Sequence, residues 1–385
     1  MDYEDRLRRA REEMRKRNIG MMFLTYGANL WYLASVHRLE PRLTDTNTYG
    51  DYVCGAYIGA DGGLSLVAPR MGRAFFQREA ASKPWIDEVR VIDESERPRD
   101  VLAEVVKSFR LKGRGVSLDD RTWMKSGLLF QQMLSSSPIS VASDIIVPMR
   151  MIKDADEIAI MQKAGEITDE VYGEVLKFLK VGVIEYDVAH EINYQFAKQG
   201  VEYSSFMPGV RFTKPGIPRE IGALGTSIDP SRKLERGDAI TFDFGACYRG
   251  YCSDFGRTAF VGEPPAEFLR IHHLVMEAQA AAIEAMVSGA ITAMQLDSIA
   301  RNIIEEAGYG GGFTHRLGHG IGVTVHEPPY LYEPDETVLV SGMTFTIEPS
   351  IYLLDSYGCR VEDVVMVTEK GGLPFSNFHK KLSVI

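Results

Sequence analysis

The segment 238–258 carries two aspartates, Asp243 and Asp254, on the two arms of a β-hairpin, which is predicted from the alternation of apolar and polar residues. A turn is expected at 248–251, where Tyr-Arg-Gly-Tyr interrupts the alternation. A carboxylate inside an apolar strand is costly unless a partner stabilises its charge. Either aspartate alone would be interpreted as a structural acid that caps a turn. The two together, with three residues further along the chain, predict a metal site.

Those three residues are His319, Glu348 and Glu362, and both glutamates lie in or beside apolar, strand-like runs. One imidazole and four carboxylates form a ligand set of mostly oxygen atoms. Such a set suits Mn²⁺, Co²⁺, Fe²⁺ or Zn²⁺ better than Ca²⁺ or a thiolate-bound metal. Four carboxylates around one point repel each other unless cations lie between them, and two divalent ions need about this many anionic ligands. The sequence therefore predicts a centre of two divalent ions.

The order and surroundings of these five residues resemble the pita-bread metallopeptidases, the family of prolidase, aminopeptidase P and methionine aminopeptidase, with creatinase as a metal-free relative. Each short match alone is a weak signal, but five in the same order form a strong one. The matching segments are Asp243-Phe-Gly, Ser253-Asp254-Phe-Gly-Arg-Thr258, Gly318-His319-Gly-Ile-Gly, Glu348-Pro and Arg360-Val-Glu362-Asp363. The resemblance covers the C-terminal part of the chain, and more loosely the whole of it, and within the family it points to the Xaa-Pro dipeptidases.

The resemblance implies an α+β protein in which a pita-bread catalytic domain, residues 151–385, follows a smaller α/β domain, residues 1–150. The residues themselves also indicate an α/β first domain, because predicted helices and strands alternate to about residue 148. The expected helices are 3–18, 98–111 and 122–134, and the expected strands are 21–25, 52–58, 64–68, 88–92 and 115–118.

In the second domain, Asp154 is predicted to begin a long helix that Gly182 ends, with Glu157 in the capping-box position. Further helices are expected at 185–199, 265–286 and 292–307. The order of helix pair, hairpin, helix pair and further strands is a rough internal duplication, which fits a curved antiparallel sheet covered by helices.

A role for each ligand is also implied by the resemblance. Asp243 would chelate one ion, while His319 and Glu348 would help to bind the other. Asp254 and Glu362 would bridge the two ions. Such a centre lowers the pKa of a bound water towards neutrality and can polarise a carbonyl oxygen. Glu348 is in addition the best candidate to move a proton from the water towards the leaving nitrogen.

Three other residues are candidates for catalytic roles. His326 resembles the family residue that contacts the substrate carbonyl or oxyanion, and the alternative is a structural histidine in the turn before Glu-Pro-Pro. His315 is equally compatible with substrate contact and with a place in the scaffold. Arg360 is a candidate to hold a substrate carboxylate or to orient Glu362, with a structural salt bridge as the alternative.

One departure from the family pattern concerns Thr226. Prolidases, aminopeptidases P and creatinase usually carry a histidine some way before the strand with the first metal aspartate, and here that position falls near Thr226. The sequence has no histidine from 191 to 271. In the family this residue contacts substrate and is not a metal ligand in every member. Its absence therefore leaves the predicted metal site intact, but the motif match does not define the substrate.

Composition narrows the classes of partner. The 385 residues have a net charge of −10, so no basic excess is present to neutralise phosphates, and neither nucleic acid nor an anionic membrane is expected as a partner. No apolar run is long enough to span a membrane, and the acidic start Met-Asp-Tyr-Glu-Asp is unlike a signal peptide. The four cysteines form no CxxC pair and are expected to be reduced, as in a cytoplasmic protein. The family resemblance further implies a homodimer, in which the first domain borders the partner's site.

Together, the residues and the resemblance predict a dinuclear metallohydrolase that cleaves the peptide bond before proline, an Xaa-Pro dipeptidase or aminopeptidase. The alternative enzyme is a metal-dependent hydrolase or lyase of a small non-peptide metabolite, since one fold hosts several chemistries. A binding module without catalysis is a third possibility, but such a module has no need of clustered acids. The expected partner is a small peptide or another small-molecule substrate.

Overall fold

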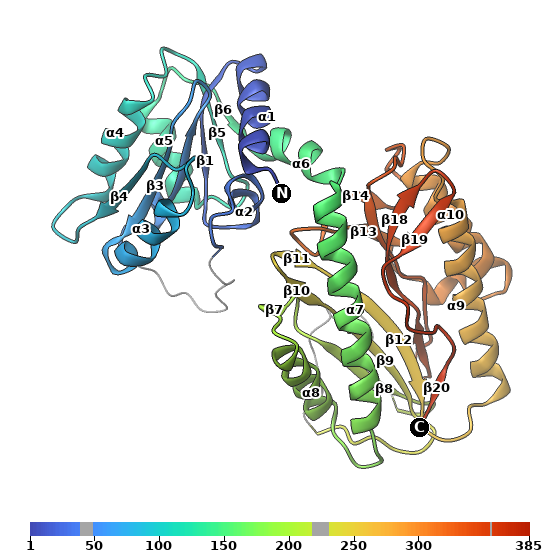
Figure 1. Ribbon diagram of the computed structural model, residues 1–385. Helices are drawn as coiled ribbons and strands as arrows, with labels where there is room; N and C mark the ends of the chain where they lie inside the picture. Colours follow the sequence, from blue (N-terminus) through green and yellow to red (C-terminus); the bar gives the residue numbers. More distant parts are fainter. Residues whose placement is uncertain (39–48, 218–230, 355) are drawn as a thin grey trace. The chain divides into compact units, whose positions relative to one another are not determined.

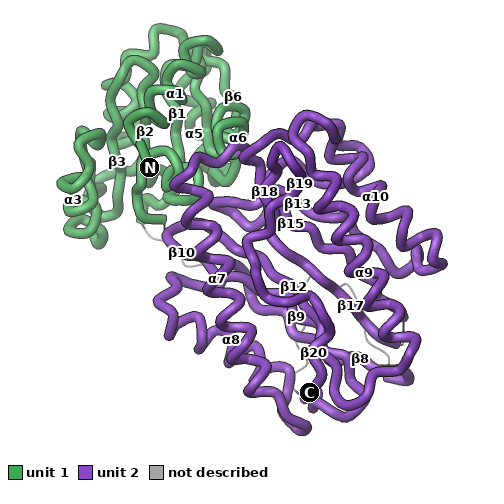
Figure 2. The backbone as a smooth tube through the Cα atoms, turned by 45° about the vertical axis from the view of Figure 1, so that its right-hand side comes forward, with its two compact units in different colours: residues 1–150 green, residues 151–385 purple. Residues whose placement is uncertain are grey.

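The structure, a computed structural model, describes residues 1–38, 49–217, 231–354 and 356–385. Its chain forms two compact units, Met1–Arg150 and Met151–Ile385, shown in different colours in Figure 2. Both units combine helices with β-sheets, so the predicted α+β class is confirmed. Within the described ranges, no helix has the length and apolar character needed to cross a membrane.

Unit 1 is built on a six-stranded mixed sheet with the strand order β4-β3-β2-β1-β5-β6. Its strands are β1 (Ile19–Leu24), β2 (Gly55–Gly59), β3 (Leu64–Pro69), β4 (Glu88–Ile92), β5 (Gly115–Leu118) and β6 (Ile139–Val141). Its helices are α1 (Tyr3–Lys16), α2 (Ala28–Ala34), α3 (Arg73–Ala81), α4 (Pro98–Ser108), α5 (Met124–Met133) and α6 (Ser143–Met151). The sequence did not predict α2, α3 or α6, because α2 and α3 have glycine at the N-cap and α6 contains Pro148.

Unit 2 contains two helix pairs, which are α7 (Ala155–Phe178) with α8 (Glu185–Lys198) and α9 (Ala266–Ala285) with α10 (Ala293–Glu306). The predicted capping box begins α7: Asp154 and Glu157 each accept the other's backbone N–H at 2.9 Å. The helix ends at Phe178 and not near Gly182, because Leu179 adopts an extended conformation and is buried in the core.

The strands of unit 2 form two main sheets, which are antiparallel except that β20 pairs in parallel with β12. The first has the order β20-β12-β9-β8 and the second β14-β13-β15-β18-β19, while β11-β10-β7 and β16-β17 form smaller sheets. Their bounds are β7 (Tyr203–Ser204), β8 (Gly209–Thr213), β9 (Ala239–Phe244), β10 (Ala246–Tyr248), β11 (Tyr251–Cys252), β12 (Phe255–Phe260), β13 (Gly318–Gly320), β14 (Glu327–Leu331), β15 (Thr344–Ile347), β16 (Ser350–Tyr352), β17 (Gly358–Arg360), β18 (Asp363–Thr368), β19 (Gly371–Pro374) and β20 (Ser383–Val384).

Unit 2 therefore has two halves of similar layout, the first from α7 to β12 and the second from α9 to β19. In Figure 1, its two main sheets lie between α7 and the α9–α10 pair. Ile240, Phe242 and Phe244 belong to the apolar core of the first half, as their predicted common face requires. The halves meet where the backbones of Gly256 and Glu362 form an isolated antiparallel bridge, which we call the junction.

The predicted hairpin is present, but it divides between two sheets. Its base is the β9–β12 pair, with Asp243 opposite Gly256, and its tip is the β10–β11 pair. At Gly245 the two arms of the hairpin come so close that a Cβ atom would lie 1.9 Å from the Ser253 carbonyl oxygen, so only glycine fits there. The break between β11 and β12 places Asp254 outside the regular strand pairing.

Candidate metal centre

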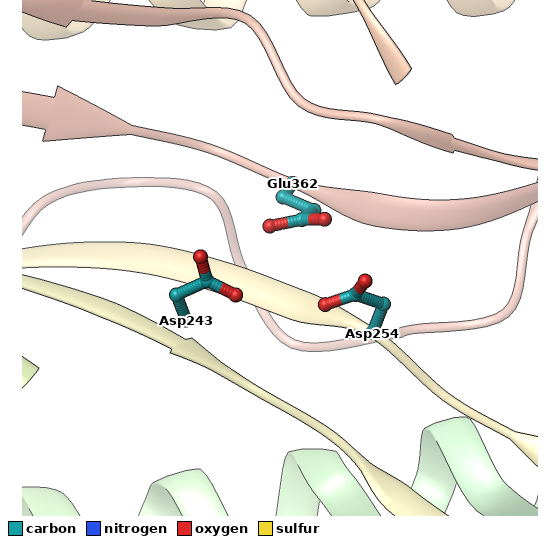
Figure 3. Close-up of side chains that lie close together, drawn as sticks. All are labelled: Asp243, Asp254 and Glu362. Carbon is teal, nitrogen blue, oxygen red and sulfur yellow. The ribbon is translucent and has the colours of Figure 1, made fainter. Parts of the chain in front are cut away.

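Three of the predicted ligands meet at the junction. Asp243, Asp254 and Glu362 each offer a carboxylate oxygen, and these oxygens all lie within 4.8 Å of one another. Figure 3 shows the two aspartates facing Glu362 across a small gap. Asp243 comes from β9, Asp254 from the break before β12, and Glu362 from the residue before β18. Both halves of unit 2 therefore contribute to the cluster.

Gly256 makes room for this arrangement. A Cβ atom at this position would lie 2.7 Å from Glu362 Oε2 and 2.8 Å from Arg360 Cδ, which is closer than Cβ contacts in proteins allow. The missing side chain lets the Glu362 carboxylate lie directly against β12, within reach of the two aspartates.

His319 and Glu348 adjoin the cluster from the second half. The Nε2 atom of His319 lies 3.4 Å from Glu348 Oε1 and 3.7 Å from Asp254 Oδ2. Thr346 holds both residues, because its hydroxyl donates to Glu348 Oε1 and accepts the backbone N–H of His319, each at 3.0 Å. The Nδ1 atom of His319 is 3.1 Å from the Gly320 carbonyl oxygen, so Nδ1 carries the proton and Nε2 keeps its lone pair for a metal. The structure thus brings all five predicted ligands together.

The buried acids lack enough positive charge to balance them. Burial, followed by the charges of neighbouring carboxylates, raises the pKa of both Asp254 and Glu362 well above the usual range. Burial is the main cause that lowers the pKa of His319 to about 3, and the nearby His326 is the second, so this ring is neutral at pH 7. Among the described residues, Asp254 Oδ1 and Glu362 Oε2 are buried without a hydrogen-bond partner. Orphaned oxygen atoms, crowded carboxylates and an available imidazole nitrogen fit divalent metal ions.

Arg360 is the guanidinium that contacts these acids. Its Nη1 donates to Asp243 Oδ2 and lies 3.7 Å from Glu362 Oε2, and its Nη2 lies 3.5 Å from Glu348 Oε2. Its Nε donates to Ser350 Oγ at 3.0 Å, which fixes the plane of the group. The structure therefore places this arginine against three carboxylates at once.

The two other predicted histidines occupy different positions. His326 is exposed, and its ring centroid is 4.1 Å from that of His319, at the edge of the cluster. His315 is half-buried, with its ring 6.3 Å from Tyr352. Its Nε2 has no hydrogen-bond partner within the described chain, and burial, then the Arg360 charge, lowers its pKa to about 4. Position 226, which bears on substrate choice, lies outside the described residues.

Sequence reasoning missed Thr346 and Gly256. Thr346 could have been found, because it stands two residues before Glu348 in a predicted strand and therefore on the same face. No local signal marks Gly256, since its role depends on Glu362, which comes from the other half.

Comparisons with known proteins identify the family of this chain. Residues 159–369 match the model of metallopeptidase family M24. The chain is 30% identical over 353 residues to YqhT, an uncharacterized peptidase of Bacillus subtilis, which covers 90% of this chain and 96% of that protein. It is 38% identical over 253 residues to the Xaa-Pro dipeptidase of Pyrococcus furiosus, covering 66% of this chain and 71% of the relative. The crystal structure of prolidase from Thermococcus sibiricus matches with a TM-score of 0.87 and 31% identity, and the match covers 100% of both chains.

These findings define the protein as a metallopeptidase with the pita-bread fold, as the sequence predicted. It belongs to metallopeptidase family M24, whose model matches more than half of the chain. Membership of this family implies that the enzyme uses divalent metal ions.

Proposed function

We propose that this enzyme is an Xaa-Pro dipeptidase or aminopeptidase that cleaves the peptide bond before proline in dipeptides or short peptides. The observation that carries the proposal is the cluster of Asp243, Asp254 and Glu362, with His319 and Glu348 beside it, in an M24 chain. The names of relatives, Xaa-Pro dipeptidase and prolidase, supply the substrate class.

Charge supports the proposal of two divalent ions, which we infer to be Mn²⁺, Co²⁺, Fe²⁺ or Zn²⁺. Four carboxylates face one another, His319 is neutral at pH 7, and Arg360 contributes one positive charge. The remaining excess of three negative charges is more than one divalent ion balances. We propose that these five clustered residues would hold the ions. When bound, such ions activate water and polarise the carbonyl group of the scissile bond.

The other residues would act on the substrate or on the ligands. Glu348, whose carboxylate is held by contacts with Thr346 and Arg360, would carry a proton towards the leaving nitrogen. Arg360 would orient the acids, since it already contacts three of them. We assign His326, exposed at the edge of the cluster, to the substrate carbonyl, and His315, whose Nε2 is open to a new partner, to a more distant part of the substrate.

Metal-dependent hydrolysis of Xaa-Pro dipeptides and longer Xaa-Pro peptides tests this function. The purified protein is loaded in turn with each of the four metals, and Xaa-Ala dipeptides serve as controls. We expect cleavage before proline, and weaker cleavage of the controls. If no Xaa-Pro bond is cut with any metal while a small non-peptide compound is turned over, a second candidate function replaces this proposal. That candidate is a metal-dependent hydrolase or lyase of a small non-peptide metabolite, and the absence of the family's histidine near Thr226 favours it.

We also propose that the enzyme is a cytoplasmic homodimer in which the N-terminal unit borders the partner's site, as the family resemblance implies. Light scattering at working concentration should give a dimer, and a fully active monomer would contradict this proposal. The reduced state of all four cysteines is in keeping with the cytoplasm.

A further inference from the structure

A buried ion pair lies next to His326 but outside the proposed ligand set. The Nζ atom of Lys153 is 2.8 Å from Glu327 Oε1, and these side chains are 2% and 4% exposed. Lys153 stands just before α7, and Glu327 directly follows His326 at the start of β14. Removing two opposite charges from water is costly, so such a pair requires close geometry and further hydrogen bonds.

The surroundings of this ion pair meet that requirement. A Cβ atom at Gly322 would lie 2.7 Å from Glu327 Oε1 and 2.9 Å from Lys153 Cε, so only glycine leaves room for the contact. The backbone N–H of Lys153 donates to the Gly342 carbonyl at 3.0 Å. The second carboxylate oxygen of Glu327 lies 3.2 Å from the Thr324 hydroxyl, which is also 3.2 Å from the His326 carbonyl oxygen.

These contacts fix the loop 322–327 at both ends. At its start, the Gly322 carbonyl accepts the N–H of Cys252 at 2.8 Å, which ties the loop to the hairpin tip. At its end, Lys153 holds Glu327. The imidazole of His326, in contrast, makes no hydrogen bond to another described residue, and its ring contact is with His319. The position of this imidazole is therefore set by the backbone that carries it.

We propose that Lys153 is a positioning residue for His326. By holding the Glu327 carboxylate, Lys153 fixes the backbone from which His326 would reach the substrate, and the ion pair itself involves none of the proposed metal ligands. The inference rests on the role given to His326 in the proposed function. A misplacement of about 1 Å by a distant mutation can cost roughly a hundredfold in rate, so the loss of this anchor should be measurable.

The first test is Lys153→Met in the metal-loaded enzyme with an Xaa-Pro dipeptide. We expect kcat to fall by about ten- to a hundredfold, with KM and metal content close to those of the wild type. The matched control is Arg232→Met, which breaks another buried ion pair, Arg232–Asp238, whose side chains are 10% and 0% exposed. Among the described residues, the hydrogen bonds and ion pairs of Arg232 and Asp238 do not involve the loop 322–327, so the control should lose stability and keep its kcat. An equal loss of kcat in the control would overturn the proposal.

A double-mutant cycle supplies the readout that a purely structural role would not change. Lys153→Met and His326→Ala are measured singly and together. If Lys153 acts through His326, the double variant is no slower than His326→Ala alone. Independent losses that multiply would overturn the proposal. If the wild type cleaves Xaa-Pro bonds and His326→Ala is equally fast, the positioning role is wrong while the proposed peptidase function stands.

A second pair of variants keeps the test valid if Lys153→Met does not fold. Lys153→Met/Glu327→Gln leaves no unpaired buried charge, so we expect its thermal stability to recover while its kcat stays low. Lys153→Arg keeps the charge and should restore kcat to within a few-fold of the wild type. If the neutral double variant is as fast as the wild type, the ion pair does not position His326.

Discussion

Two arginines cross between the halves of unit 2 in opposite directions, and their surroundings differ. Arg257 of β12 reaches the second half, where it donates to Asp363 Oδ1 at 2.7 Å and to the Glu362 carbonyl oxygen at 2.6 Å. Arg360 of β17 reaches the first half, where it donates to Asp243. We call the contacts of Arg257 and of Arg360 with the opposite half the Arg257 crossing and the Arg360 crossing. Both lie close to the junction, so they can be compared directly.

The Arg257 crossing has enough positive charge for its one acid. Asp363 is fully buried, but it receives a second cation from Lys380 at 2.9 Å and an amide hydrogen bond from Gln279 at 3.2 Å. The Arg360 crossing is not balanced, because one guanidinium faces three carboxylates and Asp254 adds a fourth charge nearby. Burial of charge therefore does not distinguish the metal centre from the scaffold. The excess of negative charge does, and bound cations would remove it.

Among the substitutions, the largest effect is expected from Asp254→Asn, which removes one charge from the unbalanced crossing. We expect activity to fall by more than about a hundredfold, the upper range for residues that only support a ligand, together with a loss of bound metal. Metal analysis and steady-state kinetics measure both. The control is Asp238→Asn, a buried acid in the same half outside the cluster, which should stay active. Full activity in Asp254→Asn would remove this residue from the proposed ligand set.

Arg257→Met should break the Arg257 crossing. It removes no proposed ligand side chain, but it does remove the hydrogen bond to the backbone carbonyl oxygen of Glu362. Because it leaves the buried Asp363 with less positive charge, we expect a loss of about 3–5 kcal/mol in the free energy of unfolding. Denaturant titration of the metal-loaded protein measures this loss, and the kcat of the folded enzyme should change little. A loss of activity with unchanged stability would mean that both crossings serve the reaction.

Metal removal tests whether bound cations balance the excess negative charge around Arg360. A chelator should abolish activity and lower the melting temperature, because the four acids again repel one another without cations. Metal at a hundred times its dissociation constant should contribute about 2.7 kcal/mol of stability. Thermal unfolding at increasing Mn²⁺ concentration checks this, with Asp254→Asn as a control that shows a smaller shift. A melting temperature that does not depend on metal would contradict the charge argument.

The smallest effect is expected from Arg360→Lys, which keeps the charge but loses the planar group that reaches three acids. We expect kcat/KM to fall about tenfold, or about 1.4 kcal/mol of transition-state stabilisation. Arg90→Lys is the matched control, since Arg90 in unit 1 also contacts more than one carboxylate, Glu96 at 2.6 Å and Glu104 at 3.1 Å. Equal activity in both variants would mean that Arg360 acts only as a point charge.

The features that could be predicted from sequence are those set by local periodicity. The alternation around Asp243 predicted its strand and its face, and the capping box at Asp154 predicted the start of α7. The division of the hairpin at Gly245 depends on a close approach to Ser253 that no propensity encodes. The pairing of Lys153 with Glu327 joins residues 174 positions apart, and only the folded chain brings them together.

The glycine at position 256 has a consequence for which substitutions this enzyme can accept. It supplies no ligand atom and no charge, yet any side chain there would strike the Glu362 carboxylate. In saturation mutagenesis, we expect position 256 to be as intolerant as Glu362 itself, which would resemble the profile of a ligand. A shorter acid at 362 would not leave space for alanine at 256, because Arg360 Cδ and the Cβ atom of residue 362 would still lie 2.8 and 2.9 Å from the added carbon. Position 256 is therefore expected to remain glycine whichever acid stands at 362.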